Sequence, residues 1–331
     1  MMKTSRITIE EREKILYYLS RDTSYRQIAQ YLDRSHTTIS REVKRNRKEG
    51  EYSPSFAEGR TRNRFSRCGR KRKIDQNLEL FEEVFNKLFQ KWSPEQISGY
   101  LKNKYKGNLQ MQISHESIYQ YIYAKAKGEL KKQFLKYLRH KGRKNKNRKL
   151  SYEKRGQIPD AVSIHLRPEE VEDRRVPGHW EGDLVMGKDH KTAIGVLVER
   201  TTRYVFITPL KAKKAVDVRE AFSHHFLDVP DFLKKSLTYD RGKEMVQHKA
   251  FTQDTKIPVY FADPHSPWQR GSCENTNGLI RDFFPKGTDF SKVTNEELKH
   301  VQHMLNERVR KTLNWKTPEY MFKKLIGAIK P

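Results

Sequence analysis

The chain has few cysteines, no long apolar run and too few acidic residues to balance its basic ones. Its 331 residues include two cysteines, Cys68 and Cys273, which lie far apart in the sequence. We therefore expect neither a disulfide framework nor a cysteine zinc site. One of the longest apolar runs, residues 193–198, is much shorter than the roughly 18 residues of a transmembrane helix. The N-terminus leads into charged residues without the apolar core of a signal peptide. These absences predict a cytoplasmic chain that crosses no membrane.

The positive charge is concentrated in the first half of the chain. In total, 68 Lys+Arg stand against 41 Asp+Glu, for a formal net charge of +27. Residues 1–156 hold 39 basic and 17 acidic residues, whereas residues 157–331 hold 29 and 24. An excess of this size favours a polyanionic partner, and nucleic acid is the first candidate. The first half is thus predicted to bind the partner, and the second half to be an ordinary globular domain.

Two segments of the first half are strongly basic. Residues 139–149 contain seven Lys or Arg in eleven positions, and residues 60–73 contain eight. Blocks of like charge repel themselves and favour an extended chain. We expect both segments to be arms or linkers that can also contact the phosphates of a nucleic acid.

The first helical pattern predicts a DNA-binding unit of three helices. Residues 8–20 open with a capping box, in which Thr8 caps the helix and Glu11 reaches back. A short second helix is expected from about Ser24, and a third over residues 36–46. A short helix, a tight turn and a helix with polar residues first and cations later is typical of a major-groove reader.

The third helix is expected to turn its polar face toward DNA. Ile39 and Val43 are four residues apart and are predicted to point into the unit. The outward residues that we expect to contact base edges or phosphates are His36, Thr37, Thr38, Ser40, Arg41, Lys44 and Arg45. A three-helix bundle with a merely charged face is the alternative to a DNA-binding unit.

A second helical unit is predicted over residues 76–123. An amphipathic helix at 76–90 is followed by Ser-Pro-Glu-Gln at 93–96, which is typical of a capped helix start. A further capped helix begins at Ser114 and places His115 in its first turn, where we expect a DNA contact. This unit is predicted to be a second helix-turn-helix, with a dimerisation bundle as the alternative.

The second half alternates between strand-like and helical runs. The expected elements are strands at 184–186, 193–198 and 204–210, a helix at 216–226, and strands at 236–240 and 259–262, with a helix between the last two strands. This α/β order is compatible with an RNase H-like sheet. The predicted fold class is α+β multidomain, with all-α helix-turn-helix domains followed by an α/β RNase H-like domain of the integrase-core type.

The predicted domain plan has four parts. They are a helix-turn-helix domain with a basic arm at 1–66, a second helix-turn-helix-like domain at 67–135, a basic linker at 136–172 and the RNase H-like domain at 173–331.

Three acidic residues stand where they could share metal ions. Asp183 is expected to open the first strand, although aspartate is depleted in strands. Asp240 ends the fourth strand and Glu274 begins a helix. Carboxylates from separate elements suit Mg²⁺, and two such ions can activate the attacking oxygen and stabilise the leaving oxygen in phosphoryl transfer. Glu181 and Asp189 are the alternatives to Asp183.

A cation lies on the same helix as the third acid. Arg281 is seven residues past Glu274, two turns along the same face. We expect it to hold a DNA phosphate beside two Mg²⁺ ions, for which Mn²⁺ can substitute.

Four motifs together resemble the DDE transposases of the insertion-sequence IS30 family. They are Trp-Glu-Gly-Asp at 180–183, the runs at 239–244 and 263–281, and the helix at 35–42. The resemblance covers nearly the whole chain. It implies that Asp183, Asp240 and Glu274 are the catalytic triad of an RNase H-like core that cleaves DNA and joins it to target DNA.

The resemblance also implies partners. The N-terminal domains are expected to bind the terminal inverted repeats of an insertion sequence, and a homodimer or larger homo-oligomer is expected to bring two DNA ends together. The expected location is the bacterial cytoplasm, in association with the nucleoid. A catalytically silent, sequence-specific DNA-binding regulator is the alternative, but it leaves the spacing of the three acids unexplained. An RNase H-like nuclease acting on RNA or hybrids would need no pair of helix-turn-helix units.

Overall fold

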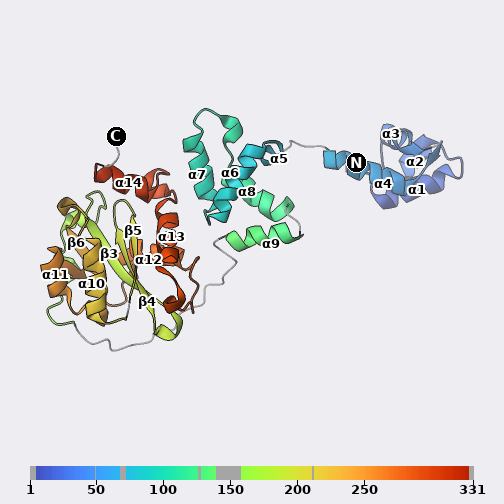
Figure 1. Ribbon diagram of the computed structural model, residues 1–331. Helices are drawn as coiled ribbons and strands as arrows, with labels where there is room; N and C mark the ends of the chain where they lie inside the picture. The colour runs from blue at the N-terminus through green and yellow to red at the C-terminus, as the bar shows by residue number, and fades with distance from the viewer. Residues whose placement is uncertain are drawn as a thin grey trace. The chain divides into compact units, whose positions relative to one another are not determined.

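The chain divides into two compact units. The computed structural model describes residues 5–48, 50–67, 72–125, 128–138, 158–210 and 212–327. The units are Met1–Arg72, which is helical, and Lys73–Pro331, which combines helices with a five-stranded sheet (Figure 1). The predicted basic arm at 139–149 lies outside the described residues, and the division into four domains stays a prediction.

The first unit is a bundle of helices with a small apolar core. Its elements are α1 (Ile9–Leu19), α2 (Tyr25–Tyr31), α3 (His36–Asn46), the strand pair β1 (Arg47–Lys48) and β2 (Glu51–Tyr52), and α4 (Pro54–Arg67). The predicted capping box is present, with Thr8 and Glu11 satisfying each other's backbone N–H groups at the start of α1. The fully buried apolar residues are Ile15, Ile28, Ile39, Val43 and Ala57. The first three helices and their start signals are thus confirmed.

The basic segment after this bundle is helical where we expected an extended arm. Arg12 of α1 is only 2% exposed and pairs with Glu58 of α4 and, at 2.7 Å, with Glu42 of α3. Arg12 also donates to Thr61 at 3.0 Å. These contacts hold α4 against the bundle, so the expectation of an arm was wrong for residues 60–67.

The second unit begins with a group of helices. They are α5 (Lys73–Gln76), α6 (Leu78–Phe89), α7 (Pro94–Lys104) and α8 (His115–Gln120), a π-helical turn at Tyr121–Lys125, and α9 (Gly128–Tyr137). Ser93 and Gln96 form the predicted capping box of α7. Leu80, Val84 and Ile97 are fully buried in the shared core.

These helices pack against a segment from the far end of the chain. Val309 belongs to their apolar core, and Trp315 packs against it. Gln96 donates to the carbonyl of Val309 at 2.9 Å, and Asn103 donates to the carbonyl of Asn314 at 3.0 Å. The helical group is therefore held by residues about 200 positions away, which no local pattern could indicate.

The sheet of the second unit has the strand order β5-β4-β3-β6-β7. The strands are β3 (His179–Met186), β4 (Ala193–Glu199), β5 (Val205–Pro209), β6 (Ser236–Tyr239) and β7 (Val259–Phe261). The first three are antiparallel neighbours, whereas β3, β6 and β7 run parallel. Helix α10 (Ala215–His225) lies between β5 and β6, and α11 (His248–Thr255) between β6 and β7, so the predicted α/β order is confirmed.

Helices cover both faces of this sheet (Figure 1). Leu197 of β4 points into a core shared with Phe222 of α10 and Phe251 of α11. Its neighbour Val196 points the other way, into a core shared with α12 (Gly271–Ile280) and α13 (Asn295–Asn306). This alternation is the period of two that a strand requires. A final helix, α14 (Pro318–Leu325), adds Phe322 to the first core.

Two expected boundaries change. β3 begins at His179, so Asp183 lies inside the strand and does not open it; the residues before it are buried and belong to the sheet. Residues 158–172, expected in the basic linker, fold onto the sheet, where the N–H of Phe261 donates to the carbonyl of Val162 at 2.8 Å. In the described part of the chain, no helix is long and apolar enough to cross a membrane.

Candidate active site

Two of the predicted acids lie side by side on neighbouring strands. In the parallel pair β3 and β6, Glu181 is opposite Thr238. Asp183 and Asp240 each follow two residues later, where side chains return to the same face of a sheet. Asp183 is inside β3, and Asp240 comes directly after β6. Their side chains keep 23% and 24% of their surface exposed, so both remain open to a ligand.

A single guanidinium bridges the two carboxylates. Arg270 ends the short 3-10 helix Pro267–Arg270, directly before α12. Its Nη1 lies 3.4 Å from Oδ1 of Asp183, and its Nη2 lies 3.5 Å from Oδ2 of Asp240. Nη1 also donates to the carbonyl of Gly182 at 3.1 Å, which fixes the guanidinium between the strands.

The charges at this cluster depend on one another. Burial raises the pKa of Asp183; Arg270 opposes this shift, and the nearby Asp240 adds to it. Burial alone would lower the pKa of Arg270, but the two carboxylates outweigh it and raise that pKa. Two acids that share one cation in a half-buried place hold a local excess of negative charge, which a divalent cation would offset.

The third predicted acid lies on the helix that covers these strands. Glu274 is in the first turn of α12 and is exposed. Asn277, three residues further on, donates from Nδ2 to Oδ2 of Asp183 at 2.8 Å. Residues three apart share a helix face, so Glu274 is on the face of α12 that meets β3. Its carboxylate does not join the pair: among the described residues, no three His, Cys, Asp or Glu side chains form a group that could hold a metal.

The rival acids have other positions. Glu181 is fully buried, accepts the N–H of Cys273 at 2.8 Å and lies 3.5 Å from Nε of Arg200. It therefore ties β3 to the first turn of α12. Asp189 is exposed in a short 3-10 turn, with a left-handed φ of 50°. Of the three candidates around β3, only Asp183 faces Asp240.

Arg270 and Asn277 are site residues that sequence reasoning missed. Asn277 lies three residues after Glu274 on the same face of α12, and this spacing is a signal that could have identified it. Arg270 lies at the end of the preceding 3-10 helix and is brought to the acids by the fold. Gly182 also has a packing role: a Cβ there would meet the ring of Tyr239 at 2.8 Å, so a larger residue would push β3 away from β6.

The predicted phosphate ligand Arg281 is engaged with backbone. Its Nη2 donates to the carbonyl of Met186 at 2.5 Å, and its Nη1 to the carbonyl of Phe284 at 3.5 Å. These bonds join the end of α12 to the end of β3. A phosphate contact by Arg281 stays a prediction.

The predicted DNA-contacting residues of the first unit lie on the outer side of α3. His36, Thr37, Arg41, Lys44 and Arg45 are exposed, and Thr38 and Ser40 are half-buried. Ile39 and Val43 are fully buried, as predicted. In the second unit His115 is exposed at the start of α8, which Ser114 caps. Contact of any of these residues with DNA stays a prediction.

Comparison with protein families identifies both ends of the chain. Residues 3–46 match a family model described as a helix-turn-helix domain, and residues 173–267 match one described as an integrase core domain. The first match covers α1 to α3. The second contains Asp183 and Asp240 and ends before Glu274.

Several relatives are similar over nearly the full length. The transposase for insertion sequence element IS1086 of Cupriavidus metallidurans is 42% identical over 317 residues, covering 96% of this chain and 94% of the relative. Transposase InsI for IS30A of Escherichia coli K12 is 42% identical, covering 97% and 84%. The transposase for IS4351 of Bacteroides fragilis is 36% identical, covering 97% and 96%.

A solved structure aligns with the second half of the chain. The catalytic core domain of BIV integrase covers 46% of this chain and 97% of its own, with 16% identity and a TM-score of 0.37. The fold assignment rests on the strand order and on the integrase-core match. Together with relatives of 42% identity along nearly the whole sequence, these findings establish that the chain belongs to the IS30 family of insertion-sequence transposases.

Proposed function

We propose that this protein is a DDE transposase that binds the terminal inverted repeats of its insertion sequence, cleaves the DNA strand at the element end and joins that end to target DNA. The proposal depends mainly on one observation. Asp183 and Asp240 both lie within 3.5 Å of the Arg270 guanidinium, next to the helix that carries Glu274. The proposed triad is Asp183, Asp240 and Glu274.

The donor set fits Mg²⁺. The two aspartates supply oxygens that face one position, and the buried Oδ1 atom of the half-buried Asn277 has no hydrogen-bond partner among the described residues. Hard oxygen ligands of this kind are the ones that Mg²⁺ or Mn²⁺ prefers. When bound, a pair of such ions would activate the attacking oxygen and stabilise the leaving oxygen of the phosphodiester.

The chain's own residues have distinct tasks in this proposal. Asp183 and Asp240 would act as metal ligands, and Glu274 would approach them from α12. Arg270, freed from the acids by a bound cation, is placed to take the phosphate of the cleaved strand, because a guanidinium pairs with phosphate as it does with carboxylate. Glu181 fixes the helix start that carries Glu274.

DNA binding is assigned mainly to the first unit. The exposed residues of α3 are proposed to enter the major groove at the terminal repeat, with Lys44 and Arg45 on phosphates. Because two element ends must be cut and joined together, we propose that the working form is at least a homodimer. The location in the bacterial cytoplasm stays a prediction.

The test is cleavage and strand transfer on DNA that carries the element end. Asp183→Asn, Asp240→Asn and Glu274→Gln should each lower activity with Mg²⁺ by about 10³-fold or more, because each removes a proposed metal ligand. Binding to the terminal repeat should be unchanged, because the changes lie outside the first unit.

The matched controls are Asp189→Asn and Glu296→Gln, two exposed acids away from the cluster. Both should retain wild-type activity. Full activity of Asp183→Asn or Asp240→Asn would refute the triad, whereas activity in Glu274→Gln alone would remove only the third ligand. A wild-type protein that binds the repeat but cuts no DNA with Mg²⁺ or Mn²⁺ would instead be the regulator.

A further inference from the structure

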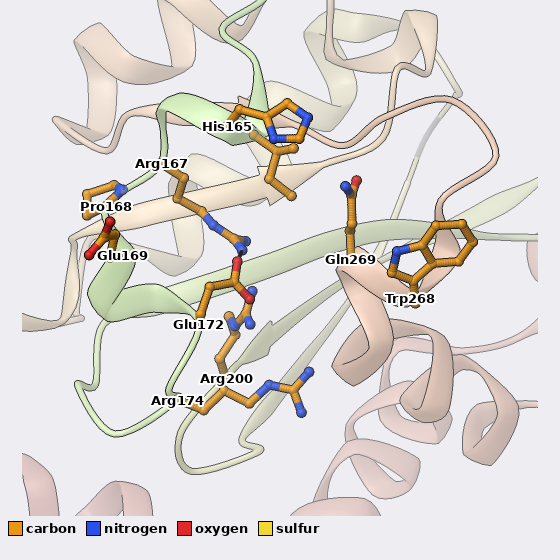
Figure 2. Close-up of a pocket in the computed structure, with 10 residues that line it drawn as sticks. His165, Arg167, Pro168, Glu169, Glu172, Arg174, Arg200, Trp268 and Gln269 are labelled. Carbon is orange, nitrogen blue, oxygen red and sulfur yellow. Dashed lines mark hydrogen bonds and ion pairs between the residues drawn. The ribbon is translucent and has the colours of Figure 1, made fainter.

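A pocket of about 310 Å³ opens next to the acid cluster. The residues that matter in its wall are Arg167, Glu172, Arg174, Arg200, Trp268 and Gln269 (Figure 2). Trp268 and Gln269 directly precede Arg270, the residue that bridges Asp183 and Asp240. Arg200 contacts Glu181, two residues before Asp183 on β3. A ligand in this pocket would therefore adjoin the proposed reaction centre.

The wall holds three arginines against two acids, Glu169 and Glu172, so positive charge is in excess by one. Arg167 forms an ion pair with Glu172 and donates a hydrogen bond to the hydroxyl of Thr238 at 2.9 Å. Arg200 is 2% exposed and lies 3.5 Å from Glu181, yet its buried Nη1 has no hydrogen-bond partner among the described residues. Arg174 is exposed beside it.

The neighbouring cations also affect the pKa of Arg200. Burial lowers the pKa of Arg200 to about 10; Glu181 opposes this, and the like charges of Arg167 and Arg174 add to it. A buried guanidinium N–H that lacks an acceptor costs free energy until a ligand supplies one. An anion would balance the positive charge and would also supply the missing hydrogen-bond acceptor.

The other side of the pocket presents an aromatic face. Trp268 is 71% exposed, so its indole ring is open to a ligand. The turn that carries it is fixed, because Gln269 donates to Asp263 at 2.9 Å and accepts the N–H of Asp263 at 2.8 Å. Every nucleobase has a π-face that can stack on an indole, whatever the sequence.

We propose that this pocket binds one nucleotide that has left the DNA stack next to the cleaved phosphodiester, with its phosphate at Arg174 and Arg200 and its base stacked on Trp268. The inference rests on the proposed transposase function and deepens it. An unpaired nucleotide is favoured over intact duplex, because a base can reach the indole only when it is unstacked. Holding it there keeps the strand in place while the adjacent bond reacts.

The experiment compares two DNA probes without metal, in the full-length chain. One is the fully paired element end; the other carries a single unpaired nucleotide at the cleavage position. By fluorescence anisotropy, Trp268→Ala should weaken binding of the second probe about tenfold, the effect of one lost stacking contact, and should leave the first unchanged. Trp268→Phe should recover most of the loss. Arg174→Gln should weaken the second probe, and Arg174→Lys should weaken it less.

The control is Phe232→Ala, which removes a half-exposed ring that does not line the pocket and should change neither probe. An unchanged melting temperature of Trp268→Ala confirms that the fold is intact. If Trp268→Ala binds the unpaired probe as tightly as the wild type does, or loses affinity equally for both probes, the proposed nucleotide site is wrong.

The same proteins are then assayed for cleavage with Mg²⁺. If the wild type cleaves DNA but Trp268→Ala shows no selective loss of affinity for the unpaired probe, only the proposed nucleotide site is wrong. The difference between probes without any cleavage overturns the proposed chemistry and leaves a binding site for unpaired DNA.

Discussion

At the scale of single residues, Arg270 holds the carboxylates of Asp183 and Asp240 close together. Without it, two carboxylates on adjacent strands would repel each other in a half-buried place. With it, their oxygens converge within 3.5 Å of one cation. The arrangement keeps the acids preorganised, and a metal ion that binds them must compete with this guanidinium.

Removing that cation should strengthen metal binding. In Arg270→Gln the aspartates lose their internal counter-ion, so Mg²⁺ should raise the melting temperature more than it does in the wild type, because a ligand that binds the folded state more tightly stabilises it more. Calorimetry with and without Mg²⁺ measures the shift. Arg281→Gln, whose guanidinium contacts carbonyls, should behave like the wild type. Equal shifts in all three proteins would contradict the competition.

His225 makes folding sensitive to acid. It lies at the end of α10, stacks on Phe206 and hydrogen-bonds Thr208, both on β5. Burial, with a contribution from the neighbouring His224, lowers the pKa of His225 to about 4. Between pH 6.5 and 4 the unfolded chain binds a proton at this position and the folded chain does not. The stabilising contribution is therefore complete above pH 6.5 and is lost as the pH falls toward 4.

Replacing the imidazole should remove this pH dependence. We expect His225→Gln to lose less stability than the wild type between pH 6.5 and 4, by about 1–3 kcal/mol. Thermal unfolding at a series of pH values measures the difference. His224→Gln removes only the smaller contribution, that of an exposed histidine, and should keep most of the pH dependence because burial of His225 remains. A His225→Gln curve parallel to that of the wild type would show that another group carries the effect.

Helix α12 is the element that assembles the site. Its start is tied to β3 through Glu181 and Cys273, its middle through Asn277 and Asp183, and its end through Arg281 and Met186. Three connections along ten residues fix both the position and the rotation of the helix. Glu274, three residues before Asn277, is thereby held in a fixed place beside the contact of Asn277 with Asp183.

A second element-level contact joins the helical group to the C-terminal segment. Gly99 is buried in α7, and a Cβ there would collide with the ring of Trp315. Glycine is otherwise unfavourable in a helix, so close packing explains it. The contact adds to the hydrogen bonds between α7 and the segment at Val309 and Asn314.

Filling that space should loosen the packing. Gly99→Ala should lower the free energy of unfolding of the second unit by about 1–3 kcal/mol, the usual effect of overpacking. Gly278→Ala is the control, since a Cβ there meets nothing within 4 Å, and it should be neutral or stabilising. Urea denaturation compares the two. A neutral Gly99→Ala would mean that Trp315 moves aside freely.

The uneven charge organises the molecule as a whole. The first half of the sequence carries most of the +27, whereas the half that contains the acid cluster is close to balanced. A near-neutral second half suits the proposed role of its acids as metal ligands close to a phosphate. A strongly basic half supplies affinity through the release of counter-ions from DNA.

The salt dependence of binding should report this division. Lys44→Gln and Arg45→Gln should each lower the slope of log K against log salt by about 1, if each residue neutralises one phosphate. Lys292→Gln removes an exposed cation of the second half and should leave the slope unchanged. Titrations of a terminal-repeat duplex at several salt concentrations measure the slopes. Equal changes of the slope in the three variants would mean that the net charge of the protein sets the salt dependence, and that Lys44 and Arg45 make no specific phosphate contacts.

Local signals were sufficient for most of the elements. Capping residues such as Thr8, Ser24 and Ser93 place helix starts correctly because a cap satisfies backbone N–H groups within three residues. Short β-prone runs between turn residues identify β4 and β5. Residues 60–67 were misread because charge density alone does not reveal the partner that Arg12 finds in Glu58. The start of β3 was misplaced because its first polar residues, His179 and Glu181, are buried by contacts from elsewhere.

The sequence by itself determined the partner class, the helix-turn-helix pattern and the α/β order, because charge and periodicity are properties of neighbours along the chain. It also predicted three acids, and their joint role stays a prediction. Only the tertiary structure decided which acids meet. Asp183 and Asp240 come together through the register of β3 and β6, and Arg270 and Asn277 join them through the docking of α12. The pocket beside them likewise depends on Arg200 and Trp268, which are 68 positions apart in the sequence and are placed in one wall by folding.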